Sequence, residues 1–256
     1  MEQTSLDLPV TQQPKPLVRF DNAINRAVLN YSVMEMRVVL LAMSKIPPLQ
    51  KVKEDEVYYV HAGELLNFGV DPNACFRFLK SVAQTLRTKP ILMRQADLAA
   101  KGIYLKGAKR DDLFEFSLLD ACTYQRGEGR VGLVFHRFAI PFLTELRQRF
   151  TQFPIAHLAG INSTYGIRLY GLLEQFEGTG LWVVDLKTFR DVMGIDPAQY
   201  KLYGHLKQRV IQQAVDEINN APNPKFFISE VEEFKVGRKV VRLAFHFKKV
   251  QPDQPN

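Results

Sequence analysis

The chain has 256 residues, of which 46% are hydrophobic and 24% charged, and it carries a formal net charge of +7. These proportions are typical of a soluble globular protein. The sequence shows neither a run of about eighteen apolar residues nor a charged-then-apolar leader, so we expect a cytoplasmic protein without a membrane partner. Cys75 and Cys122 have no paired spacing, which indicates free thiols in a reducing compartment. The excess of positive charge favours a polyanion as partner.

The amino-terminal half is expected to hold a tail and a first domain. Residues 1–17 are polar and contain prolines, which predicts a disordered tail. Residues 18–146 form the expected first domain. Its predicted helices are 33–44 and 74–86, and its predicted strands are 57–60, 91–94, 102–105, 113–118 and 131–135. The strands after the second helix are separated by turn-prone segments at 106–112 and 126–130, so we interpret them as an elaborated hairpin.

The carboxy-terminal half is expected to hold a simpler second domain. Residues 147–160 are predicted to be a linker, in which Pro154 stops any helix. Residues 161–249 form the expected second domain, and residues 250–256 a second tail. The predicted elements are helices at 163–176 and 200–219, a strand at 181–184, and a hairpin of strands 226–231 and 240–247 around a turn at 235–239.

The two halves share a short phrase in the same context. G-V-D-P at 69–72 and G-I-D-P at 194–197 lie 125 positions apart, each between a short apolar helix and a longer amphipathic one. Gly194 permits the positive φ that ends a helix, Asp196 can bond its own backbone, and Pro197 prevents the helix from continuing. Helix, strand, helix, turn, helix and hairpin is the order of a winged helix. We therefore predict an α+β fold of tandem winged-helix domains, although the turn alone also fits a helical hairpin used only for packing.

The last long helix has an apolar stripe and a polar face. Leu206, Val210, Ala214 and Ile218 recur every fourth position and should pack inward. The residues expected to point outward near its start are Lys201, Tyr203, His205, Lys207, Gln208, Arg209 and Gln212. Arg, Lys and Gln side chains can donate hydrogen bonds to base edges and phosphates, so this face suits a helix that reads a DNA groove. A solvated amphipathic helix is the plainer alternative.

Three segments in order carry a resemblance to a known family. They are NAINRAVLNYSVMEMRVVLLAMSKI at 22–46, YGIRLYGLLEQF at 165–176 and YKLYGHLKQRVIQQAVDEIN at 200–219, followed by GRKVVRLAFHF at 237–247. Together they resemble the Rep_3 family of plasmid replication initiators over most of the chain. The resemblance implies two winged-helix domains that bind repeated origin sequences (iterons) in double-stranded DNA. It also implies a homodimer that represses its own gene at an inverted repeat, and monomers that recruit the host replication initiator and helicase.

The resemblance also implies where DNA is contacted. The family's basic residues at the start of the last helix match Lys201, Lys207, Gln208 and Arg209, and Gln208 stands where some members have arginine, which would favour adenine over guanine. In the hairpin turn, Arg238 and Lys239 match the family's basic turn and are expected on phosphate, and Lys235 of the same basic hairpin is a further candidate. The weaker candidates in the first domain are Lys80, Arg87, Lys109 and Arg110.

The sequence predicts no catalytic residue, metal site or cofactor. A rolling-circle nickase needs a pair of histidines two positions apart, and His61, His136, His157, His205 and His246 never have that spacing. Gly102 and Gly107 have the spacing of a phosphate loop, but Ala108 stands where lysine is required. We therefore expect an initiator and not an enzyme. A winged-helix transcriptional regulator without an initiation role remains open as the alternative.

Overall fold

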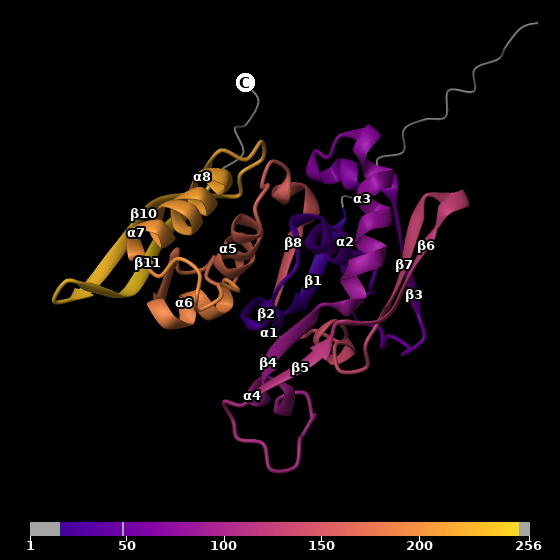
Figure 1. The fold of residues 1–256 in the computed structure, drawn as a ribbon, viewed down its shortest axis with the longest axis horizontal. Coiled ribbons are helices and arrows are strands. Elements are labelled where there is room, and N and C mark those ends of the chain that lie inside the picture. The colour runs from indigo at the N-terminus through magenta and orange to yellow at the C-terminus, as the bar shows by residue number, and fades with distance from the viewer. Residues whose placement is uncertain (1–15, 48, 251–256) are drawn as a thin grey trace, which may run out of the picture.

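A computed structural model of the chain describes residues 16–47 and 49–250. The two predicted tails lie outside the described residues except at their inner ends, and Leu17 already belongs to the first strand. The described residues mix helices and strands throughout, which confirms the α+β class (Figure 1).

The first half contains most of the strands. In order, its elements are β1 (Leu17–Asp21), α1 (Asn22–Arg26), β2 (Val28–Leu29), α2 (Val33–Ser44), β3 (Val57–His61), the 3-10 helix η1 (Ala62–Phe68), α3 (Pro72–Thr85), η2 (Leu86–Thr88), β4 (Pro90–Arg94), α4 (Gln95–Ala99), β5 (Leu113–Ser117), β6 (Leu119–Gln125), η3 (Arg126–Glu128), β7 (Arg130–Phe135), η4 (Ile140–Phe142), β8 (Phe150–Pro154) and η5 (Ile155–Leu158).

The second half is simpler. It contains α5 (Thr164–Glu174), β9 (Leu181–Asp185), α6 (Leu186–Val192), α7 (Tyr203–Leu206), a π-helical turn η6 (Lys207–Gln212), α8 (Gln213–Asn219), β10 (Phe226–Val236) and β11 (Lys239–Lys249). Because α7, η6 and α8 run on without a break, we call residues 203–219 the carboxy-terminal helix.

The two halves repeat one topology, as the paired phrases predict. In the first, α2, β3, η1 and α3 are followed by the hairpin β6–β7, and the sheet order is β3–β7–β6. In the second, α5, β9, α6 and the carboxy-terminal helix are followed by the hairpin β10–β11, and the sheet order is β9–β11–β10. We call each hairpin a wing. In Figure 1 the two wings project at opposite ends of the molecule.

The elaborated hairpin predicted in the first half is wrong in detail. The segment β4–α4–β5 is an insertion that forms its own sheet with β2, separate from the wing. The strand predicted at 102–105 does not form, because the segment closes the end of α4. Gly102 has a φ of 77°, the Ile103 amide donates to the Leu98 carbonyl at 3.0 Å, and the Gln95 side chain donates to the Ile103 carbonyl at 3.0 Å.

The predicted linker at 147–160 is built into the fold. Its strand β8 pairs antiparallel with β1, so that Leu17 lies opposite Pro154. Phe153, Ile155 and Leu158 are buried. Pro154 is predicted to stop a helix, but it lies in β8, where a proline is tolerated because β1–β8 is a sheet of edge strands alone. The prediction was wrong because the partner strand lies more than a hundred residues earlier.

Helix α5 joins the two halves. Every residue from Gly166 to Glu174 is buried, so the helix is surrounded on all sides. Figure 1 shows it between the carboxy-terminal wing and the helix α2. Asn25 of α1 donates from Nδ2 to the Gly171 carbonyl of α5 and to Thr151 Oγ1 of β8, each at 2.8 Å. The buried side chains of both halves form one continuous hydrophobic core.

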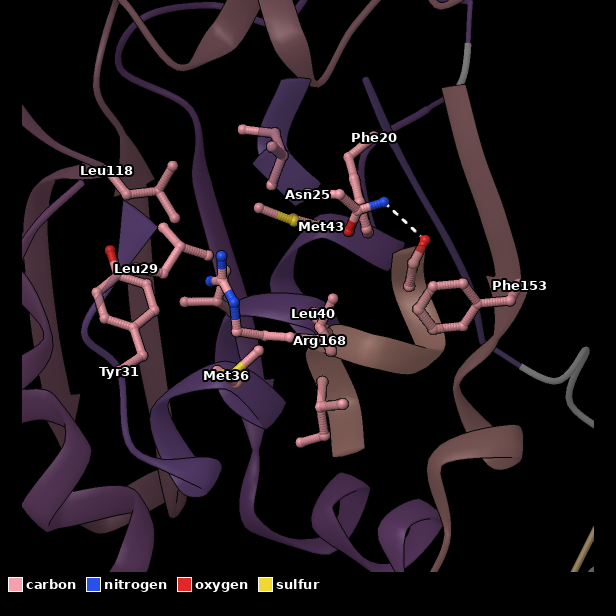
Figure 2. A pocket seen from close by; sticks show the side chains of 14 residues that line it. Phe20, Asn25, Leu29, Tyr31, Met36, Leu40, Met43, Leu118, Phe153 and Arg168 are labelled. Atoms are coloured by element: carbon pink, nitrogen blue, oxygen red, sulfur yellow. Dashed lines mark hydrogen bonds between the residues drawn. The ribbon is translucent and has the colours of Figure 1, made fainter. Parts of the chain in front are cut away.

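Arg168 is a buried charged residue of α5, and it lies where α5 connects the two halves, a region that we call the joint. Its guanidinium donates from Nη2 to the Ala27 carbonyl at 2.6 Å and from Nε to the Val192 carbonyl at 2.7 Å, so one side chain ties the end of α1 to α6. Figure 2 shows it projecting beside Tyr31, Leu29 and Met36 near a cavity of about 50 Å³. Burial lowers the pKa of Arg168 to about 10, so it stays charged at neutral pH.

We expect Arg168→Ala to lower the free energy of unfolding by about 3 kcal/mol, because two buried carbonyl oxygens lose their donors. Chemical denaturation measures this. Arg147→Ala is the control, since Arg147 is exposed, and its effect should stay within about 0.5 kcal/mol. Equal effects of the two substitutions would show that Arg168 does not hold the joint.

Candidate nucleic-acid interface

The turn of the first half positions α3. Gly69 ends η1 with a φ of 71°, and the Asp71 side chain caps α3 by accepting from the Asn73 amide at 2.7 Å. The buried side of α3 is formed by Cys75, Leu79 and Val82. The exposed polar and basic residues on the other side are Asn73, Arg77, Lys80, Ser81 and Gln84. The helix therefore presents a stripe of hydrogen-bond donors to solvent.

The turn of the second half is longer and is held by Arg190. Gly194 has a φ of 67°, and Asp196 Oδ1 accepts from the Ala198 amide at 2.7 Å, as the sequence predicts. The Arg190 guanidinium of α6 donates to the carbonyls of Asp196 and Gln199, and to that of Tyr200 at 3.2 Å. Tyr200 has a φ of 45°, unusual for a residue with a side chain. Arg190 thus stabilises a strained turn immediately before the carboxy-terminal helix.

The packing face of the carboxy-terminal helix is confirmed. Leu206, Val210, Ala214 and Ile218 are each no more than 1% exposed. The π-helical turn at Lys207–Gln212 lies in the segment predicted to contact DNA, and such turns occur often at functional sites.

The opposite face carries a group of exposed polar side chains. Lys201, His205, Gln208 and Arg209 are exposed, and within the part of the chain that the structure describes their side chains make no hydrogen bond or ion pair. Lys201, His205 and Arg209 line a shallow hollow together with Tyr200 and Leu202. We call Lys201, His205, Gln208 and Arg209 the reading face, after the DNA-reading role that the sequence predicts for this helix. Nothing in the described fold competes for their donors.

Two of the residues predicted to point outward also contact the wing. Tyr203 is partly buried and donates its hydroxyl proton to Glu233 Oε1 of β10 at 2.9 Å. Lys207 Nζ lies 2.8 Å from the same oxygen, although its side chain is 55% exposed. The outward placement is wrong for Tyr203, because β10 runs beside the start of the helix and partly covers it, and it is confirmed for the exposed Lys207. Gln212 stays exposed and donates to Asp216 Oδ1 at 2.8 Å.

The basic residues of the carboxy-terminal wing divide in two. Arg238 and Lys239 are exposed around the turn at Gly237, and within residues 16–47 and 49–250 their side chains have no ionic partner. Lys235 Nζ lies 3.5 Å from Glu233 Oε2. The turn therefore presents two unpaired positive charges beyond the reading face.

The first-half candidates are spread over two places. Lys80 on α3 and Arg87 on η2 are both exposed and lie close together in the sequence. Lys109 and Arg110 lie in the loop of the insertion, where the Lys109 amide donates to Asp112 Oδ2 at 2.8 Å, and not in the β6–β7 wing. The corresponding wing tip carries Arg126, which is exposed and was not predicted. Arg77 and Gln84 were missed as well, although their spacing opposite Leu79 was visible in the sequence.

The described residues hold no cluster of three or more metal-ligating side chains. Among the helices of these residues, none has the length and hydropathy needed to cross a bilayer.

Comparisons with known proteins agree with the two-part architecture. A family model described as Initiator Replication protein, WH1, matches residues 17–174, and one described as Initiator Rep protein, WH2, matches residues 185–247. The solved Pi initiator protein in complex with iteron DNA is similar with a TM-score of 0.74 and 20% identity, over 94% of this chain and 100% of that one. The two halves are therefore winged-helix domains, and the first match continues through β8 and α5.

Two further solved structures are less similar. The WH1 domain of MSBI1.176, a replication protein isolated from a multiple sclerosis patient, has a TM-score of 0.34 and 18% identity over 44% of this chain and 78% of that one. Domains 2 and 3 of RctB have a TM-score of 0.44 and 10% identity over 93% of each chain.

We expect Arg190→Ala to release the turn before the carboxy-terminal helix. Amide hydrogen exchange at residues 195–202 should accelerate about tenfold or more, because a hydrogen bond from a charged group is worth about 1.5–3 kcal/mol. Exchange in α8 should not change. Lys187→Ala on the same helix is the control, since that side chain is 88% exposed. An unchanged turn in Arg190→Ala would mean that Gly194 and Asp196 suffice to hold it.

Proposed function

The chain belongs to the family of initiator replication proteins with two winged-helix domains, and we propose that it binds iteron repeats in the double-stranded DNA of a plasmid origin. The proposal extends to the cytoplasm as the place of action and to the host replication initiator and helicase as partners. It includes no catalytic step, so the protein would act by binding alone.

The reading face is the observation that carries this proposal. Its exposed donors stand at the start of a helix that follows a rigid turn, and the basic turn of the wing lies beyond it. A helix of this kind enters the major groove in helix-turn-helix proteins, and its first residues meet the base edges. The chain has an excess of positive charge, +7 in all, which suits a polyanionic ligand.

The residue types suggest a division of roles. Arg209 can donate two parallel hydrogen bonds to guanine, and Gln208 can pair with adenine. Lys201 and His205 stand at the helix start, where phosphate and base edges are both within reach. Arg238 and Lys239 on the wing turn suit phosphate contacts, which carry no sequence information. Gln212, which donates to Asp216, and Tyr203, Lys207 and Lys235, which contact Glu233, are weaker candidates for DNA contact.

The exposed stripe of α3 supports a second contact from the first domain. Lys80 and Arg87 belong to it, and we add Arg77 and Gln84. Lys109 and Arg110 remain weaker candidates, since the insertion carries them away from the wing. Two helices on one rigid chain would read two parts of one repeat.

We further propose that the chain represses its own gene as a dimer on an inverted repeat and binds single iterons as a monomer. A two-fold dimer matches an inverted repeat, whereas chains on direct repeats all face the same way. Any reorientation of the two domains between these states has to break the contacts of Arg168, because residues 147–160 do not form a free linker. A transcriptional regulator without an initiation role is the alternative.

The salt dependence of binding distinguishes residues that contact bases from residues that contact phosphates. Arg209→Ala should weaken binding to the chain's own upstream DNA by about 1–3 kcal/mol and leave random duplex nearly unaffected, because a base contact is lost. Arg238→Ala should weaken both duplexes alike and reduce the salt slope by about one, because a phosphate contact is lost. Fluorescence anisotropy at several salt concentrations measures both. Arg147→Ala controls for the loss of one charge. If neither variant differs from that control, the second domain does not contact DNA.

The assembly is tested by sedimentation. The free protein at micromolar concentration should sediment as a dimer, and its complex with a single direct repeat should contain one chain. A dimer retained on one repeat would contradict the monomeric initiator, and it would leave DNA binding itself in place.

A further inference from the structure

Glu233 contacts three donor side chains, two from the carboxy-terminal helix and one from β10. Its carboxylate accepts from the Tyr203 hydroxyl at 2.9 Å and pairs with Lys207 Nζ at 2.8 Å and Lys235 Nζ at 3.5 Å. The Glu233 side chain is 16% exposed, whereas both lysine side chains are more than half exposed. The carboxylate therefore links the first turns of the carboxy-terminal helix to the wing.

The carboxylate is ionised at neutral pH. Burial acts to raise the pKa of Glu233, but hydrogen bonds from Lys207, Tyr203 and Lys235 outweigh it, so the pKa lies below its ordinary value. Burial and the neighbouring carboxylate raise the pKa of Tyr203, so its phenol remains a donor. The group stands in an open groove of about 390 Å³ between the helix and β10, which Tyr203, Lys207 and Glu230 also line.

We propose that Glu233 is a specificity-determining residue, which withholds Lys207 and Lys235 from phosphates so that binding depends on the reading face. The inference rests on the proposed function, namely that this helix enters a DNA groove. Sequence-independent affinity comes from lysines and arginines that neutralise phosphates and release counterions. A carboxylate that pairs with two lysines cancels one of their two positive charges and holds both ammonium groups near it, so they contribute less to this affinity. Arg209 and Gln208, which have no such partner, keep their full capacity for base contacts.

On random DNA, the ion pairs of Glu233 with Lys207 and Lys235 are expected to persist. A phosphate that takes Lys207 from Glu233 leaves a largely buried carboxylate with fewer partners, and it also brings two negative charges close together. Specific binding does not require that exchange, since the reading face makes its own contacts. Glu233 thus lowers the affinity for random DNA more than the affinity for the specific site, and the ratio between the two rises.

The test compares Glu233→Gln with Glu230→Gln. Glu230 lies on the same strand, lines the same groove and is exposed, and among the described residues its side chain has no hydrogen bond or ion pair. Both changes remove one negative charge, but only the first frees the lysines. The readout is the dissociation constant for a random-sequence duplex and for the chain's own upstream DNA, each as a function of salt.

Glu233→Gln should bind random duplex about tenfold more tightly than Glu230→Gln at low salt, and its salt slope should be steeper by about two, one for each freed lysine. Its ratio of specific to random affinity should fall. Equal random-duplex binding by the two variants, or weaker binding by Glu233→Gln, would overturn the proposal. A wild-type protein that does not prefer its upstream DNA would contradict the proposed function, whereas the comparison on random duplex would still decide the role of Glu233.

A second pair of variants covers the case in which Glu233→Gln does not fold. Lys207→Gln with Lys235→Gln removes two lysines that Glu233 holds, and Arg238→Gln with Lys239→Gln removes two free charges from the same wing. The first pair should weaken random-duplex binding several-fold less than the second. Equal losses would show that the held lysines already contact phosphate.

Discussion

The contacts of Arg168 determine how the two domains are placed. One buried guanidinium binds a carbonyl from the end of α1 and another from α6, so the first domain and the turn-bearing part of the second are held by the same side chain. A buried cation is expensive to keep without partners, which makes any arrangement that removes those carbonyls unfavourable. Helix α3 and the carboxy-terminal helix are therefore presented as parts of one rigid unit and not as modules on a flexible linker.

Within the second domain, two further side chains position the carboxy-terminal helix, which we propose to read DNA. Arg190 fixes the turn in front of it, and Glu233 fixes its first turns against the wing. These contacts sort the basic residues into those that are free and those that are held. The free group contains Lys201, His205, Gln208 and Arg209, and its composition is mixed in a way that suits base edges. The held group contains Lys207 and Lys235, which Glu233 binds, and lysine acts best as a point charge on phosphate.

Local patterns predicted much of this fold. The repeat of G-V-D-P and G-I-D-P predicted the two related domains, and the stripe through Leu206 and Val210 predicted the buried face of the last helix. Both signals act over a few residues. The pairing of β1 with β8 depends on two segments far apart in the chain, and the proline at 154 pointed to a break instead. Residues 102–105 were predicted as a strand, but the positive φ of Gly102 and the hydrogen bond from Gln95 to Ile103 fold this segment into a turn that ends α4.

The site was predictable only in part, for a related reason. Helical spacing identified which residues leave the apolar stripe, but it did not identify which of them meet the wing. Tyr203 is partly buried and Lys207, although exposed as predicted, pairs with Glu233, because Glu233 lies on a strand whose length the sequence did not reveal. Lys109 and Arg110 were assigned to a wing because the insertion between α3 and β6 was read as part of it.

We propose that one rigid chain reads repeated sites at a plasmid origin. Footprinting of the purified protein on the DNA upstream of its own gene tests this most directly. The account predicts protection of several direct repeats at regular spacing, each of about twenty base pairs and so about two turns of the helix. Protection of one inverted repeat alone would contradict the role in initiation, and the absence of any protected site would contradict sequence-specific binding.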